Sequence, residues 1–290
     1  MNALKPLAKP LAVVTGASSG IGLELARHFA DHGFDLVVCA ENRALGAAAE
    51  DLRHRGADVR QVRADLATYD GVEQLCLAVT ATGRPVEAAV LNAGVSTRGL
   101  FLEADLADTA RVIDLNIAST VHLARRLLPG MVDIGAGRLL ITSSVAALVP
   151  GPYQAVYNAS KAFLLSFAEA LRDELRDTGV TVTALLPGLT DTDFFRRAGL
   201  EDTLLGSDPH KDSPVQVAAQ GYAALMRGAG RVLAGSLRSR AGGVAARLLP
   251  HALTVPAYRR RARPLMAGGP PPGSGHPRGV PGLEERVRGS

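Results

Sequence analysis

The sequence has few of the features that stabilise secreted proteins or anchor membrane proteins. It contains two cysteines, Cys39 and Cys76, which are far apart and in no CxxC pattern, and this argues against a disulfide scaffold and a zinc ribbon. No apolar run approaches the ~18 residues that cross a bilayer. The apolar run 11–14, behind Lys5 and Lys9, is too short for the core of a signal peptide. We therefore expect a cytoplasmic protein without a membrane span.

Motifs of metal-dependent hydrolases and serine hydrolases are missing as well. The seven histidines form no HExxH pattern, and none clusters with a cysteine. His28 and His32 share one face of an expected helix, where we interpret them as surface residues. Ser144 lacks the Gly-x-Ser-x-Gly turn of a serine hydrolase. We therefore expect neither a metal site nor hydrolase chemistry.

The positive charge of the chain is concentrated near its C-terminal end. The net charge is +4, yet residues 257–290 alone hold seven arginines against Glu284 and Glu285, so the rest of the chain is close to neutral and gives no reason to expect nucleic-acid binding. The same segment contains the Gly/Pro-rich run 268–275, a composition that cannot bury a core. We expect this tail to be solvated and disordered. Contact of its arginine cluster, 259–263, with a membrane surface or nucleic acid remains the alternative.

Segments of strand and helix character alternate from residue 10 to residue 190. The segments expected to be strands are 11–15, 34–40, 59–63, 86–91, 137–142, 180–186 and, further on, 231–234. The segments with helical spacing of apolar residues are 21–30, 44–55, 71–80, 103–128, 154–177 and 214–226. This alternation predicts an α/β fold with a Rossmann-type doubly wound parallel sheet, in one domain over residues 8–256 that includes a small C-terminal helical extension. Ligands of such sheets bind at the carboxyl ends of the strands.

A glycine-rich turn lies between the first expected strand and the first expected helix. Glycines let the backbone approach a pyrophosphate, and a helix N-terminus offers it free N–H groups. The candidate residues are Gly16, Ser18, Ser19, Gly20, Ile21 and Gly22. Glu41, at the end of the second strand, is placed to accept hydrogen bonds from an adenosine ribose and to repel a 2′-phosphate, which favours NAD. Arg43 stands two residues on and favours a phosphate, so NAD and NADP both remain open.

Three further strand ends carry candidates for the cofactor site. The candidates are Asp65 and Leu66 after the third strand, Asn92, Ala93 and Gly94 after the fourth, and Pro187, Gly188, Thr190 and Thr192 after the sixth. Each of these segments is also compatible with an ordinary turn or helix cap. Their common position at the carboxyl edge of the sheet favours a shared cofactor site.

Tyr157 and Lys161 lie four residues apart in the helical segment 154–177. Such residues share one helix face, and a neighbouring ammonium group is expected to lower the pKa of the tyrosine toward the range of an acid–base catalyst. Asn116 lies inside the segment 103–128, where it is expected either to bond a partner helix or to bend its own helix around a water.

These motifs in this order resemble the short-chain dehydrogenase/reductase family in its classical form, over about residues 8–235. The motifs are Thr15-Gly16-x-x-x-Gly20-x-Gly22, Asn92-Ala93-Gly94, Asn116, Ser144, Tyr157-x-x-x-Lys161 and Pro187-Gly188. Parts of the sequence are similar to a bacterial oxidoreductase subgroup of poorly defined substrate, whose members often carry arginine where this chain has Glu41 and Asn42. The resemblance implies an NAD(P)-dependent enzyme that transfers hydride between nicotinamide and a carbonyl or alcohol. It also implies a homodimer or homotetramer built on the helices 103–128 and 154–177.

The resemblance further implies a role for each catalytic residue. Tyr157 exchanges a proton with the substrate oxygen, and Ser144 positions and polarises that oxygen. Lys161 lowers the tyrosine pKa and holds the nicotinamide ribose, while Asn116 holds a water linked to Lys161. Thr192 and the backbone near Thr190 fix the carboxamide and pyrophosphate. A non-catalytic dinucleotide-binding regulator or scaffold on the same fold is the alternative, which loss of the Ser-Tyr-Lys set would favour.

The substrate is expected to be hydrophobic. Segment 193–213 has no strong helical or strand period and is interpreted as a mobile lid over the site. The apolar residues expected to line the pocket are Val145, Val149, Tyr153, Phe194 and Phe195. They favour a small-molecule carbonyl or secondary alcohol of lipid-like, steroid or aromatic type.

Overall fold

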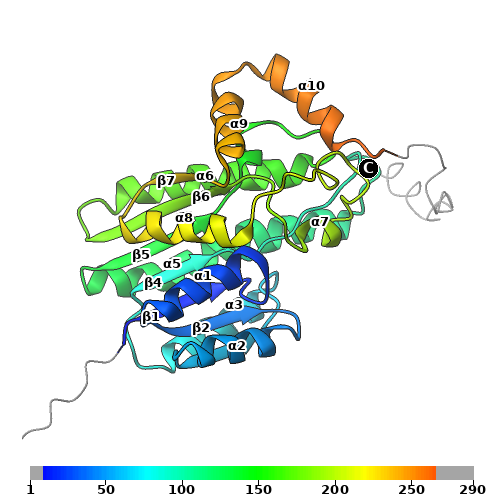
Figure 1. The fold of residues 1–290 in the computed structure, drawn as a ribbon. Coiled ribbons are helices and arrows are strands. Elements are labelled where there is room, and N and C mark those ends of the chain that lie inside the picture. Colours follow the sequence, from blue (N-terminus) through cyan, green and yellow to red (C-terminus); the bar gives the residue numbers. More distant parts are fainter. Residues whose placement is uncertain (1–8, 266–290) are drawn as a thin grey trace, which may run out of the picture.

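A parallel sheet of seven strands forms the centre of the computed structural model, which describes residues 9–265 (Figure 1). The strands are β1 (Leu11–Thr15), β2 (Asp35–Ala40), β3 (Val59–Arg63), β4 (Ala88–Leu91), β5 (Gly137–Thr142), β6 (Val180–Pro187) and β7 (Arg231–Ala234). Their order in the sheet is β3-β2-β1-β4-β5-β6-β7, with every pairing parallel. The expected doubly wound sheet is confirmed. The order reverses between β1 and β4, which is where such sheets open a ligand crevice.

Helices cover both faces of the sheet. One face carries α1 (Gly20–Asp31), α2 (Leu45–His54) and α8 (Pro214–Met226), and the other carries α3 (Tyr69–Thr80), α5 (Ser119–Asp133) and α6 (Ala155–Glu174). Successive residues of a strand point to opposite faces, so Val13 and Val14 of β1 belong to the two different apolar cores. Both faces of the central strands β1, β2 and β4 are therefore buried, which is why these strands are mostly apolar, whereas the edge strand β3 exposes Arg60, Gln61 and Arg63.

The helix expected over residues 103–128 is interrupted. It consists of α4 (Leu106–Val112), a π-helical turn η1 (Ile113–Ala118) and α5. The helix begins later than expected because Asp105 caps it, accepting the backbone N–H of Ala107 at 2.7 Å. The π turn is centred on Asn116, which is fully buried. π turns of this kind are frequent at functional sites.

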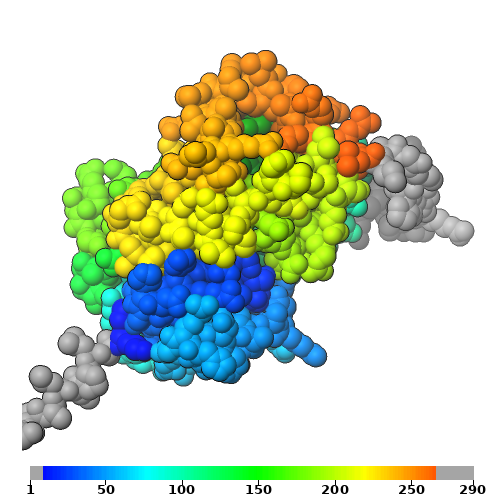
Figure 2. All heavy atoms as spheres, in the orientation of Figure 1, coloured from blue at the N-terminus to red at the C-terminus, as the bar shows by residue number. Residues whose placement is uncertain are grey.

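The region after β6 adds short helices beyond the sheet. They are α7 (Phe194–Arg197), α9 (Leu237–Leu248) and α10 (His251–Ala262). Figure 1 shows α9 rising from the β7 side and α10 reaching toward α7, and Figure 2 shows α8 between α1 and these two helices. No described helix is long and apolar enough to cross a membrane.

The expected domain boundary at residue 256 is wrong by several residues. Helix α10 continues to Ala262, which is 1% exposed and packs in a small apolar cluster with Phe195 and Leu205. Apolar residues on the inner side of α10 therefore outweigh the arginine run that suggested a disordered tail. The rest of the expected tail, 266–290, lies outside the described residues.

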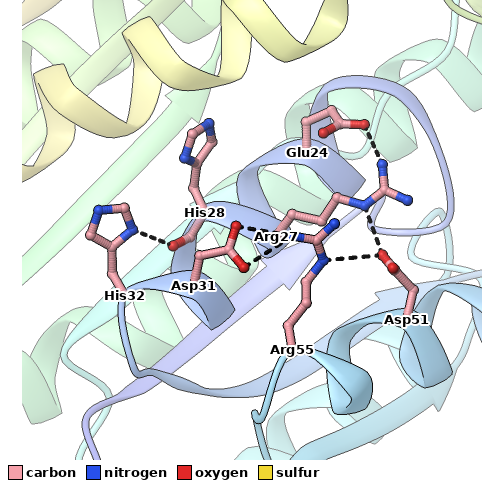
Figure 3. Close-up of polar contacts among 7 residues, drawn as sticks. All are labelled: Glu24, Arg27, His28, Asp31, His32, Asp51 and Arg55. Atoms are coloured by element: carbon pink, nitrogen blue, oxygen red, sulfur yellow. Dashed lines mark hydrogen bonds and ion pairs between the residues drawn. The ribbon is translucent and has the colours of Figure 1, made fainter.

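Ion pairs join α1 to α2 on the surface of the domain. Arg27 contacts Glu24 at 2.6 Å and Asp51 at 2.7 Å, and Arg55 contacts Asp31 at 2.9 Å (Figure 3). The hydrogen bond from Arg27 is the main cause that lowers the pKa of the Asp51 carboxyl. These contacts hold two helices of one layer together rather than forming a site.

His28 and His32 lie beside this network and against α8. The ring of His28 stacks on that of Tyr222 at a centroid distance of 5.5 Å, and the ring of His32 is tilted toward Tyr222 at 4.7 Å. His28 is half-buried and His32 exposed, as expected for surface histidines. Burial is the main cause that lowers the pKa of His28. No cluster of potential metal ligands occurs among residues 9–265.

Candidate active site

The carboxyl ends of the strands border a cavity of about 470 Å³. That volume is within the range of small-molecule sites. The residues predicted for the cofactor that line it are Gly16, Ser18, Ser19, Gly20, Ile21, Glu41, Asp65, Leu66, Asn92, Ala93, Gly94, Tyr157, Lys161, Pro187, Gly188, Thr190 and Thr192. Ser144 lines it too. Segments far apart in the sequence thus meet at one edge of the sheet.

Gly22 was predicted to contact the cofactor but does not line the cavity. A Cβ at this position would lie 2.2 Å from the carbonyl oxygen of Gly16 and 2.6 Å from Nδ2 of Asn92. Gly22 therefore allows α1 to approach the turn that precedes it. The turn itself depends on Gly16, whose φ of +66° favours glycine.

Asn116 also lies behind the cavity wall rather than in it. Its Nδ2 donates to the carbonyl of Val95 at 2.9 Å and to Oγ of Ser160 at 3.0 Å, and its Oδ1 accepts from the N–H of Val95 at 2.9 Å. The expectation that Asn116 bonds a partner helix is confirmed, because Ser160 belongs to α6. The side chain fastens the π turn both to α6 and to the segment that follows β4.

Lys161 lines the cavity from a buried position. Its Nζ donates to the carbonyl of Thr142 at 2.9 Å, and its own carbonyl accepts from Oγ of Ser143 at 2.7 Å. The side chain is thereby tied to the end of β5. Burial lowers the pKa of Lys161 to about 8.

Tyr157 does not show the lowered pKa that its spacing from Lys161 suggested. Burial raises its pKa to about 12, and only the neighbouring Ser144 side chain opposes that rise. The Lys161 ammonium lies 5.8 Å from the centre of the tyrosine ring and is directed at Thr142, so it does not compensate for the lost solvation of a phenolate. At neutral pH the Tyr157 hydroxyl therefore keeps its proton in this structure.

An arginine missed in the sequence joins Glu41 and Asp65, the two acidic cavity residues predicted for the cofactor. Arg111, from α4, contacts Asp65 through two hydrogen bonds of 2.9 and 3.1 Å and Glu41 through one of 2.5 Å. Its hydrogen bonds are the main cause that lowers the pKa of Asp65. Arg111 lies 70 residues from Glu41, and no local motif marks it. Arg111 therefore offsets part of the negative charge by which Glu41 was expected to repel a 2′-phosphate.

Comparison with known proteins identifies the family. A sequence model described as short chain dehydrogenase matches residues 10–202. The chain belongs to this family. A sulfoacetaldehyde reductase of Chromohalobacter salexigens is 36% identical to the dehydrogenase over 190 residues, which cover 63% of this chain and 74% of that protein.

Solved structures agree in fold and differ in nucleotide. A short-chain dehydrogenase from Sphingobium yanoikuyae in complex with NADPH is 30% identical, with a TM-score of 0.72 over 77% of this chain and 87% of the other. A short-chain dehydrogenase/reductase from Burkholderia phymatum in complex with NAD is 26% identical, with a TM-score of 0.74 over 90% and 98%. This dehydrogenase is therefore an NAD(P)-dependent oxidoreductase that acts on a carbonyl or alcohol, and either nucleotide is compatible with it. Nothing in the comparisons supports the non-catalytic alternative.

Four of the five apolar residues predicted for the substrate pocket line the cavity of the dehydrogenase. Val145, Val149, Phe194 and Phe195 line it, but Tyr153 does not. The backbone of Tyr153 has a φ of 68°, and its side chain packs against the apolar cluster around Phe195 instead. The prediction for Tyr153 is wrong because a left-handed residue in the loop turns the ring away from the site.

Helix α10 contributes a residue that the sequence analysis missed. The Tyr258 hydroxyl lies 2.7 Å from Oε1 of Gln154 and 3.1 Å from Oδ1 of Asn158, and burial raises its pKa. Both Tyr258 and Gln154 line the cavity. The signal was the four-residue spacing of Thr254, Tyr258 and Ala262, which share the inner face of the helix.

Small and charged residues complete the substrate end. Ser239, Gly242, Gly243 and Ala246 of α9 form one wall, and the charged or titratable lining residues are Arg197, Asp208, His210, Arg238 and Arg261. Residues of segment 193–213 line the cavity, and the role of the segment as a mobile lid stays a prediction.

Proposed function

We propose that this dehydrogenase interconverts a hydrophobic carbonyl compound and its secondary alcohol, with Tyr157 as the acid–base residue. The observation that carries the proposal is that Ser144, Tyr157 and Lys161 line one cavity with an apolar wall, with the Ser144 side chain close enough to Tyr157 to affect its pKa. In reduction Tyr157 gives its phenolic proton to the carbonyl oxygen, and in oxidation it takes the hydroxyl proton of the alcohol. Ser144 orients that oxygen.

The residues around the glycine-rich turn fit a dinucleotide. A Cβ at Gly16 would lie 2.8 Å from Nδ2 of Asn92, so the turn leaves no room for a side chain there. At the start of α1, Ser19 makes no side-chain cap, which leaves backbone N–H groups of the helix for a phosphate. The nicotinamide supplies or accepts the hydride when the cofactor is bound. Thr190 and Thr192, with the backbone near Pro187 and Gly188, are proposed to orient it.

Lys161 and Asn116 are proposed to be positioning residues. The buried Lys161 ammonium is proposed to hold the nicotinamide ribose and to stabilise the charge that develops on Tyr157 when it loses its proton. Asn116 supports the π turn beside α6 and is proposed to keep a water within reach of Lys161. A pKa of Lys161 near 8 makes proton exchange possible close to neutral pH.

For the nucleotide, Glu41 supports a modest preference for NAD. Its carboxylate lines the cavity beside that of Asp65, since both bond Arg111, and a 2′-phosphate bound there would meet both charges. Arg111 offsets part of that charge, so the preference is expected to be small.

The substrate proposal is tested by turnover. A panel of ketones and aldehydes that differ only in the length of their apolar chain is assayed with NADH and with NADPH. The catalytic efficiency is expected to rise with chain length because Val145, Val149, Phe194 and Phe195 bury the additional methylene groups. Equal or higher efficiency with short polar substrates would contradict the hydrophobic assignment while leaving the reaction class intact.

We also propose that the dehydrogenase is a homo-oligomer and lies in the cytoplasm. Leu106 and Phe163, on α4 and α6, are 81% and 42% exposed and support a homodimer or homotetramer built on these helices. Cys39 and Cys76 are both free and buried, which supports a cytoplasmic location. The molar mass in solution tests the first expectation.

A further inference from the structure

The outward face of α9 carries a stripe of large apolar side chains. Leu237, Val244 and Leu248 are 80%, 47% and 75% exposed. Val244 and Leu248 follow Leu237 at whole numbers of turns of a helix with about 3.6 residues per turn, so the three side chains lie on one line. Leu249 and Leu253, 46% and 61% exposed, continue the surface into α10. Each is a side chain that a globular domain normally buries.

The inward face of the same helix is made of small residues. Ser239, Gly242, Gly243 and Ala246 face the cavity, and a Cβ at Gly243 would already lie 3.0 Å from Leu233. Helix α9 thus directs its small residues inward and its large apolar residues outward, the reverse of an ordinary surface helix. The exposed large apolar residues are therefore not the edge of a buried apolar face of α9.

Arginines accompany the exposed apolar residues. Residues 237–265 hold seven arginines and no aspartate or glutamate. Arg240 and Arg247 flank the stripe on α9, and Arg260 lies on the same side of α10 as Leu253. Within the described part of the chain none of these three arginines forms an ion pair. We call this surface the outer face of α9–α10: Leu237, Val244, Leu248, Leu249, Leu253, Arg240, Arg247 and Arg260.

We propose that the outer face of α9–α10 docks on the surface of an anionic lipid bilayer. Leucines enter the boundary between headgroups and acyl chains, and the flanking arginines contact the phosphates, as in helices that lie in a membrane interface. Figure 2 shows both helices at one extremity of the molecule, in orange, where a planar surface has access to them. The helices lie on the bilayer and do not cross it.

Charge and chemistry favour a bilayer over other partners. Nucleic acid is bound through phosphates and base edges, a contact that has no use for several exposed leucines. A symmetric contact with a second copy would bring the arginines of the two copies together. An anionic bilayer satisfies the leucines and the arginines at once.

Docking would place the cavity beside the lipid. The inner residues of α9 and Tyr258 of α10 line the substrate end, so the helices that touch the bilayer also form the wall of the site. A membrane-dissolved substrate then has a short path to Tyr157. This consequence rests on the proposed function, whereas docking itself is measured without turnover.

Flotation with vesicles tests the proposal on the full-length protein. The wild type is expected to float with vesicles that contain phosphatidylglycerol and not with vesicles of phosphatidylcholine alone, and added salt is expected to release it. Changing Leu248→Ser and Leu253→Ser is expected to weaken binding about tenfold for each leucine. Changing Arg240→Gln and Arg247→Gln is expected to weaken it about fivefold for each arginine.

A matched control is Leu77→Ser, since Leu77 of α3 is 65% exposed but lies in another layer. It should float like the wild type, and all variants should keep the wild-type melting temperature. Equal flotation of the Leu248/Leu253 variant and the wild type would overturn the proposal, as would equal binding to neutral vesicles. Binding to a DNA duplex without vesicle binding would replace the bilayer by nucleic acid. A lower molar mass of the Leu248/Leu253 variant in solution, without vesicle binding by the wild type, would identify the face as a subunit contact.

Discussion

The cofactor end and the substrate end of the cavity are built by different means. At the cofactor end, short segments at the ends of strands present backbone and small side chains, and each segment is fixed by the strand that precedes it. At the substrate end, α7 and α10 pack through one apolar cluster, and Tyr258 of α10 contacts Gln154 at the start of α6, 104 residues away in sequence. The sheet therefore determines the structure of the cofactor end. The structure of the substrate end depends on helices outside the sheet, which can change without disturbing the strands.

This difference assigns separate tasks to the two ends. The family model matches residues 10–202, which include all the predicted cofactor and catalytic residues but neither α9 nor α10. We infer that the nucleotide is handled by the part that the family model covers, and that α9 and α10, which also line the cavity, affect the fit of the substrate. Changes at the two ends should then affect different kinetic constants.

The largest expected effect is at Tyr157, where both ends meet. In Tyr157→Phe the proton donor is lost while the ring stays, so kcat is expected to fall by about 10²–10⁴-fold, with little change in nucleotide affinity. Steady-state turnover and nucleotide titration by fluorescence measure the two. Tyr69→Phe, at a tyrosine 71% exposed on α3, is the control and should behave as the wild type. Unchanged turnover in Tyr157→Phe would remove this residue from the mechanism.

A second effect should be confined to the cofactor end. In Gly22→Ala the new methyl group meets the carbonyl of Gly16, and overpacking of this kind costs about 1–3 kcal/mol, so nucleotide affinity is expected to fall roughly tenfold to a hundredfold. Gly46→Ala is the matched control, because nothing lies within 4 Å of a Cβ at that position of α2 and alanine favours the helix. Isothermal titration measures affinity, and thermal unfolding should show Gly46→Ala unchanged or more stable. An unaltered nucleotide affinity in Gly22→Ala would mean that the nucleotide still binds when α1 lies further from the glycine-rich turn.

The sequence predicted the cofactor end of the cavity well, because the structure there follows from local patterns. The strands, the glycine-rich turn and the residues after each strand follow from apolar periodicity and turn chemistry, both of which act over a few residues. Prediction from the sequence failed where contacts between distant segments determine the structure. Arg111 gives no local sign that it will meet Glu41, and Tyr153 leaves the cavity because of one left-handed residue in a loop.

The electrostatic expectation failed for a related reason. Spacing on a helix predicts that Tyr157 and Lys161 share a face, yet it does not predict that the Lys161 ammonium will bond the carbonyl of Thr142. Burial then dominates, raising the pKa of one residue and lowering that of the other. The arginine run of α10 likewise led us to expect a disordered tail. The opposite face of this helix carries Tyr258 and Ala262, which pack against apolar residues of segment 193–213.

A third prediction concerns nucleotide choice. In Glu41→Arg the carboxylate partner of Arg111 is replaced by a second cation, so NADP is expected to gain and NAD to lose affinity, shifting their ratio about tenfold or more, as for one charge-assisted hydrogen bond. Glu169→Arg is the control, since Glu169 is similarly exposed and pairs with a single arginine, Arg231, away from the cavity. The ratio of KM values for the two nucleotides measures the shift. A ratio that stays constant would show that Glu41 does not face the ribose.

The smallest effect is expected at the substrate end. In Tyr258→Phe the hydroxyl that contacts Gln154 and Asn158 is lost while the ring stays in its apolar cluster. One hydrogen bond is worth about 0.5–1.5 kcal/mol, so KM for the carbonyl substrate is expected to rise a few-fold, with kcat and nucleotide affinity nearly constant. Kinetics at saturating nucleotide separate these constants. A fall in kcat as large as that of Tyr157→Phe would instead place Tyr258 in the proton path, and the division between the two ends of the cavity would no longer hold.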